Sequence, residues 1–109
     1  MGRTIEELID RLIAKTNSDE VKWEVESNNN TRLFLDKGSI VIRNFINSIS
    51  GEYHTVSLYD LNDKIAEYTD DSFAIDVKIS EKIKKLVNAV SAQRLRRTQE
   101  KISELYDCL

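Results

Sequence analysis

The hydrophobic and polar residues at the start of the chain follow a helical period. Apolar side chains three and four positions apart lie on one face of a helix, and the first five are Ile5, Leu8, Ile9, Leu12 and Ile13. Thr4 and Glu7 have the spacing of a capping box, in which the two side chains accept free backbone N–H groups. The pattern predicts a helix that begins after Thr4 and ends near Lys15 or Thr16.

From Val21 to Thr69 the period changes to two, which is the pattern of strands with one buried and one exposed face. Five such runs, separated by turn-prone residues, lie at 21–26, 31–36, 39–45, 53–60 and 64–69. Because the runs are short and the links between them are polar, we predict an antiparallel meander of about five strands. Trp23, in the first run, is expected to point into the core.

Two predicted hairpin loops set the register of this sheet. A two-residue loop at Lys37-Gly38 pairs Leu33 with Ile42. It gathers one set of side chains on the core face, Leu33, Leu35, Ile40 and Ile42, and a second set on the other face, Phe34 and Val41. A three-residue turn at 61–63, with Asp63 in the left-handed conformation, sorts the next hairpin in the same way. Its two sets are Val56, Leu58, Ala66 and Tyr68 on the core face and Tyr59 and Ile65 on the other.

The last third of the chain predicts an extended connection and then a helix. Residues 70–78 alternate like a strand, with Phe73, Ile75 and Val77, and Ser80 has the side chain of an N-cap. The helix that follows carries two apolar stripes, rotated by about 100° on a straight ideal helix. One straight helix cannot press both stripes on one sheet. We therefore expect either a break near 91–94 or a second half that packs elsewhere, for example on a second subunit.

These elements predict one α+β domain, 1–109, with an N-terminal helix, an antiparallel β-meander and a long or broken C-terminal helix. A chain of 109 residues is long enough for one modest core. The formal charge of −3 is too small to indicate a class of binding partner. Its distribution is uneven, because 81–107 hold seven basic and four acidic residues, whereas the rest of the chain holds nine and fifteen.

The cysteine content and the hydropathy bear on the compartment. Cys108 is the only cysteine, so an intrachain disulfide cannot form and a reducing cytosol is the expected environment. No apolar run approaches the roughly 18 residues of a membrane span, and the N-terminus lacks the pattern of a secretory signal. We expect a cytoplasmic protein that does not bind membranes.

The order of the predicted elements resembles uncharacterised small bacterial and phage-type proteins. The resemblance rests on the helix that ends in Lys15-Thr16, on Lys22-Trp23 at the first strand, on the strand 53–60 with its turn, and on the aliphatic helix that follows. It covers most of the chain. The resemblance implies a helix, sheet and helix arrangement and brings no known activity.

Residues with reactive side chains are few and scattered. His54 has no second histidine or cysteine at a metal-binding spacing, so we expect an ordinary surface or edge residue. Cys108 has no nearby base. Five carboxylates could attract a cation but are more simply solvated turn acids, and these are Asp60, Asp63, Asp70, Asp71 and Asp76. The sequence therefore predicts neither an enzyme nor a bound metal or cofactor.

The strongest basic group lies in the C-terminal helix. It consists of Arg94, Arg96, Arg97 and Lys101. On one helix face these residues could follow the phosphates of a nucleic acid. Alternatively, Arg96 pairs with Glu100 on a solvated helix face, or the group pairs with the acidic remainder of another copy. The acidic pI of about 5.2 favours the alternatives.

Two apolar surfaces have no predicted cover. One is the second face of the sheet, with Phe34, Val41, Phe45, Tyr59 and Ile65; the other is the late stripe of the C-terminal helix, with Leu95, Ile102, Leu105 and Tyr106. Contiguous exposed apolar patches usually mark interfaces, unless the C-terminal helix crosses to cover the second sheet face. We expect a non-catalytic protein-interaction module of the inhibitor, immunity or regulatory accessory type, forming a homodimer. The alternative is a small nucleic-acid-binding regulator.

Overall fold

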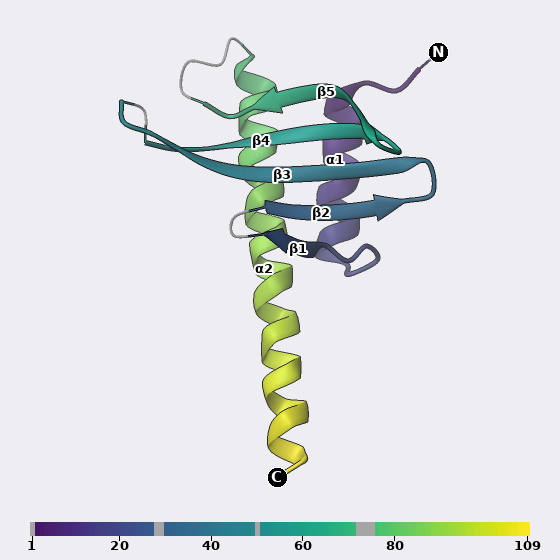
Figure 1. Ribbon diagram of the computed structural model, residues 1–109, viewed down its shortest axis with the longest axis vertical. Helices are drawn as coiled ribbons and strands as arrows, with labels where there is room; N and C mark the ends of the chain where they lie inside the picture. The colour runs from purple at the N-terminus through teal and green to yellow at the C-terminus, as the bar shows by residue number, and fades with distance from the viewer. Residues whose placement is uncertain (1, 28–29, 50, 72–75) are drawn as a thin grey trace.

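The protein is a five-stranded antiparallel sheet with two helices, as a computed structural model shows for residues 2–27, 30–49, 51–71 and 76–109 (Figure 1). The elements are α1 (Ile5–Asn17), β1 (Glu24–Ser27), β2 (Asn30–Leu35), β3 (Gly38–Asn47), β4 (Gly51–Asp60), β5 (Asp63–Thr69) and α2 (Val77–Asp107). The strands follow one another across the sheet in the order β1-β2-β3-β4-β5. The predicted α+β fold with an N-terminal helix, a meander and a long C-terminal helix is confirmed.

Both helices lie side by side on one face of the sheet, and the core forms between the two layers (Figure 1). Its buried members are Ile9 and Leu12 from α1, Ile83, Leu86 and Val90 from α2, Leu33, Ile40, Ile42 and Val56 from the sheet, and Trp23. Burial of each large aliphatic side chain contributes roughly 1.5–3 kcal/mol. The main hydrophobic core therefore lies between the two helices and one face of the sheet. Helix α2 does not cross to the other face.

The register of the β2–β3 hairpin differs from the predicted one by two positions. Leu33 pairs with Ile40 and Leu35 with Gly38, so the loop is Asp36-Lys37. Because the difference is even, each side chain keeps the predicted face. Gly38 is the first residue of β3, and this position requires glycine because a Cβ there would collide with the backbone carbonyl of Tyr59 on β4.

The β4–β5 turn also differs in detail. Its loop is the pair Leu61-Asn62 between Asp60 and Asp63, and the left-handed residue is Leu61, with φ of 55°, in place of Asp63. A bulge at Leu58/Tyr59 absorbs the difference in length. The register agrees with the predicted core-face set, because Val56 lies opposite Tyr68 and Leu58 opposite Ala66.

Helix α2 is continuous from Val77 to Asp107, so of the two alternatives expected from the sequence the break near 91–94 does not occur. The helix begins earlier than predicted because Asp76 is the N-cap, with its Oδ1 accepting the Ile79 N–H at 3.1 Å. Ser80 lies inside the first turn and donates its hydroxyl to the Asp70 carbonyl. Phe73 and Ile75, in the predicted extended connection, lie outside the described residues.

The position of α2 is fixed by a buried glutamine that the sequence pattern did not indicate. Gln93 is 1% exposed. Its Oε1 accepts the Trp23 N–H at 3.0 Å, and its Nε2 donates to the carbonyls of Val21, at 2.6 Å, and Thr16, at 3.3 Å. The Trp23 indole donates to the Thr16 hydroxyl at 2.9 Å. We call this set of Thr16, Val21, Trp23 and Gln93 the polar latch, and it joins α2 to the end of α1 and to the entry of β1.

Removing the Gln93 side chain should destabilise the fold. Gln93→Ala leaves backbone groups of Val21 and Trp23 without partners, and each buried unsatisfied group costs about 1–3 kcal/mol. We expect the free energy of unfolding to fall by about 2–3 kcal/mol in urea titrations followed by circular dichroism. The matched control is Gln99→Ala on the exposed half of the same helix, for which the change should stay below about 0.5 kcal/mol. Equal losses in both variants would contradict the role of the latch.

Candidate protein interface

The C-terminal half of α2 projects beyond the sheet (Figure 1). Every residue from Arg97 to Leu109 is exposed, including large apolar side chains. The exposed apolar residues of this half are Leu95 (72%), Ile102 (54%), Leu105 (59%), Tyr106 (76%) and Leu109. We call residues 95–109 the projecting half. Water-exposed helices of this length are marginally stable without a packing partner.

The apolar residues of the projecting half form a seam along the helix. Their spacing alternates between three and four once Thr98 is included, in the order Leu95, Thr98, Ile102, Leu105 and Leu109. This is the spacing of positions that face a partner helix. On an ideal helix the seam is rotated by more than 100° from the core-facing residues such as Leu86 and Val90. The second stripe predicted from the sequence therefore does not point into the protein's own core.

Two of the four predicted nucleic-acid-binding residues anchor α2 to the polar latch. Arg96 pairs with Asp19 at 2.9 Å and donates to the Thr16 carbonyl at 3.2 Å. Arg97 donates to the Trp23 carbonyl at 2.7 Å. The Arg96 guanidinium beside Asp19 holds the pKa of that carboxyl below its usual range, and Asp19 in turn raises the pKa of Arg96. The ion-pair partner of Arg96 is thus Asp19, whereas Glu100 was expected.

The other two basic residues, Arg94 and Lys101, form no hydrogen bond with the polar latch. Lys101 pairs with Glu104 at 2.9 Å on the same helix. Arg94 makes no hydrogen bond or ion pair with any residue that the structure describes. The four basic residues therefore do not form one free cationic surface. Arg94 is the member whose guanidinium remains available.

A groove runs along the flank of α2 beside the edge strand β1. Its volume is about 780 Å³, and the residues that matter below are Trp23, Val25, Arg94, Thr98, Lys101 and Ile102. Val25 on β1 is half exposed, and Ile102 belongs to the seam. The groove thus combines apolar surface from both elements with the unpaired charge of Arg94.

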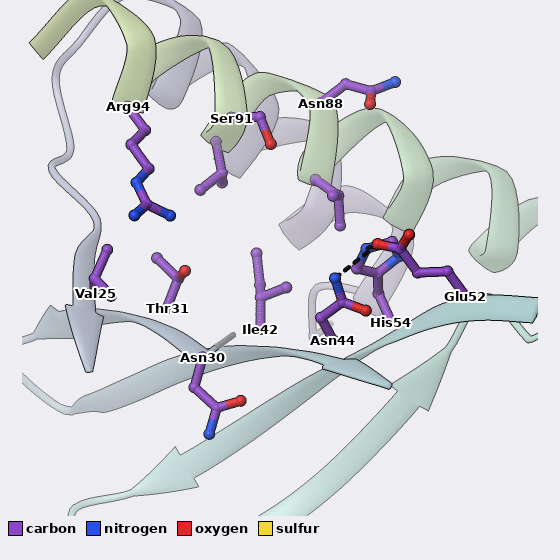
Figure 2. A pocket seen from close by; sticks show the side chains of 12 residues that line it. Val25, Asn30, Thr31, Ile42, Asn44, Glu52, His54, Asn88, Ser91 and Arg94 are labelled. Carbon is purple, nitrogen blue, oxygen red and sulfur yellow. Dashed lines mark hydrogen bonds and ion pairs between the residues drawn. The ribbon is translucent and has the colours of Figure 1, made fainter. Parts of the chain in front are cut away.

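A smaller hollow of about 350 Å³ continues from this groove between α2 and the sheet (Figure 2). At one end, Arg94 extends from α2 toward Val25 and Thr31, and at the other end Asn44, Glu52 and His54 lie together. Val25, Thr31 and Arg94 are among the residues that line both spaces, so the two spaces adjoin here.

His54 lies between two carboxylates and is not the plain surface residue that we expected. Its Nδ1 is 3.1 Å from Asp70 Oδ2, and its Nε2 is 3.5 Å from Glu52 Oε1. Asp70 also accepts the His54 backbone N–H and is 5% exposed, so it is not a solvated turn acid. The pairing depends on the β4–β5 register, which sets Thr55 opposite Thr69. No group of three His, Cys, Asp or Glu side chains placed to hold a metal occurs among the described residues.

The face of the sheet opposite the helices carries the other predicted interface residues, and its side chains partly cover one another. The Arg32 guanidinium lies 5.1 Å from the Tyr59 ring centroid and 5.7 Å from that of Phe34, and it pairs with Glu26. Val41, opposite Arg32, is fully buried and cannot contact a partner in this structure.

The remaining aromatic and apolar residues of this face are not covered by the Arg32 side chain. Phe45 stacks on Tyr53 at 5.3 Å between ring centroids, yet its side chain is exposed. Phe34 and Ile65 are about two-thirds exposed. This face therefore offers scattered apolar side chains, whereas the projecting half offers a continuous seam.

Comparisons with protein-family models, with curated proteins and with solved structures give no match for this chain. The resemblance to small bacterial and phage-type proteins therefore stays a prediction. In the described part of the chain, no helix has the length and apolar content needed to cross a membrane. Cys108 is a free, exposed thiol near the end of α2.

The Asp19–Arg96 ion pair should stabilise the protein above acidic pH. Because the folded-state pKa of Asp19 is lowered, its contribution is present above the unfolded pKa of about 3.9 and is lost as the pH falls through the folded pKa. We expect Asp19→Asn to lower the melting temperature at pH 7, and the deficit to shrink below about pH 4. Asp36→Asn in the β2–β3 loop is the control, and a deficit of the same size at pH 7 and pH 3 would contradict the ion pair's contribution.

Proposed function

We propose that this protein is a non-catalytic protein-interaction module that forms a homodimer through the projecting half of α2. The observation that carries the proposal is the seam of exposed apolar side chains on a helix that leaves the sheet. Such a helix is marginal in water by itself, and contiguous apolar surface usually marks an interface. A second copy supplies an identical seam, so two projecting halves can bury each other.

The intramolecular contacts support this use of α2. The polar latch and the hydrogen bonds of Arg96 and Arg97 fix the helix in place as far as the edge of the sheet. Beyond that edge the helix continues for several turns with its seam turned away from the core. The protein thus presents a rigidly oriented helix to a partner, as an inhibitor, an immunity protein or a regulatory accessory factor does.

The nucleic-acid alternative has weaker support. Arg96 and Arg97 are occupied by Asp19 and by the Trp23 carbonyl, and Lys101 by Glu104. Only Arg94 would meet a phosphate without first losing a contact. Retention of DNA or RNA at low salt, abolished by Arg94→Glu, would favour this alternative; absence of retention at low salt would remove it.

Disruption of the seam should convert the dimer to a monomer. Ile102→Glu places a charge in the middle of the seam, where pairing would bury it without a partner. We expect wild type to sediment as a dimer at tens of micromolar, and Ile102→Glu to sediment as a monomer with an unchanged melting profile of the sheet. Analytical ultracentrifugation measures both masses.

The matched control is Ser103→Glu, which adds the same charge on the polar side of the same turn. This variant should remain a dimer. A wild-type protein that is monomeric at these concentrations would contradict the proposal, as would equal dimerisation of all three proteins.

A further inference from the structure

We propose that the two α2 helices pair in antiparallel orientation, crossing near Glu100, so that the end of each helix lies in the groove beside the partner's β1. This inference rests on the proposed function and specifies the partner surface of the same site. A two-fold axis through the crossing makes the contact isologous, so the helix end of each copy binds in the groove of the other copy.

The seam pairs with itself in this arrangement without a gap. When the helices cross antiparallel at the level of residue 100, a residue of one copy lies opposite a residue of the other copy if their two residue numbers add up to about 200. Leu95 then meets Leu105 of the partner subunit, and Thr98 meets Ile102 of the partner subunit. The same two layers recur on the other side of the axis. All four central layers therefore bury at least one large apolar side chain.

The charges on α2 select the antiparallel direction. Residues 94–101 contain four basic side chains and one acidic, whereas residues 102–109 contain two acidic and none basic. Packed helices have axes about 8–10 Å apart, which is within about one Debye length at physiological salt. Antiparallel pairing sets the basic stretch beside the partner's acidic stretch, while parallel pairing sets like charges together.

The groove beside β1 fits this direction. It lies on the flank of α2 that carries Thr98 and Ile102, and Arg94 also lines it. Arg94 points from α2 toward Val25 and Thr31, and it has no ion-pair partner among the residues that the structure describes (Figure 2). The end of the partner's helix would cover the exposed Val25, and Glu104 of the partner subunit would come within reach of the Arg94 guanidinium.

The native Cys108 reports the orientation directly. In the antiparallel pair the two Cys108 residues are separated by 16 helical positions, or about 24 Å along the axis. Double electron–electron resonance on spin-labelled wild-type protein should give a distance near 25–30 Å. A distance below about 15 Å, or rapid Cys108 disulfide crosslinking on oxidation, would show a parallel dimer and overturn the inference while leaving the proposed function intact. A monomer would overturn both.

Charge reversal at the groove provides the second test. Arg94→Glu should raise the dimer Kd about tenfold at low salt, because two symmetry-related contacts change from attraction to repulsion. The double variant Arg94→Glu with Glu104→Arg should restore the affinity, since the charges have exchanged places across the interface. Lys84→Glu, the same charge change at an exposed position in the first half of α2, is the control and should leave the Kd unchanged. An Arg94→Glu dimer as tight as wild type, or no recovery in the double variant, would overturn the placement of the helix end in the groove.

Discussion

The side-chain amide of Gln93 satisfies backbone groups on both sides of the junction between α1 and β1, and the placement of α2 depends on it. An amide has both a donor and an acceptor end, so one side chain can serve the N–H of Trp23 and the carbonyl of Val21. An apolar residue of similar size would fill the space but would leave these groups unsatisfied. The latch therefore specifies where along α2 the junction lies, which apolar contacts alone do not.

The position of the latch along α2 determines how many of its residues extend beyond the sheet. The core uses α2 up to Val90, the latch uses Gln93, and Arg96 and Arg97 tie the next turn to Asp19 and the Trp23 carbonyl. The turns that follow have no sheet beneath them. Arg96 and Arg97, which looked like part of a ligand-binding group from the sequence, thus contact the residues before β1 and orient the helix, and the apolar stripe that follows them stays exposed.

The period of the apolar residues was enough to predict the helices, the meander and the two faces of the sheet. Hairpin details were less predictable, because Gly38 favours a loop by its backbone freedom but is required in β3 by the close approach of Tyr59. The latch and the His54–Asp70 pair could not be found from the sequence, since each joins segments whose relative position is known only after folding. The rotation between the two stripes of α2 was the informative signal, and the projecting half is its physical result.

Amide hydrogen exchange in the projecting half, measured as a function of protein concentration, tests the account most directly. If two copies bury each other's seams, the amides of residues 98–107 should become more protected as the concentration rises through the dimer Kd, while amides of the central strands stay unchanged. An isolated helix end frays, so it exchanges quickly at every concentration. Rapid, concentration-independent exchange of residues 98–107 would contradict self-association through this half of α2.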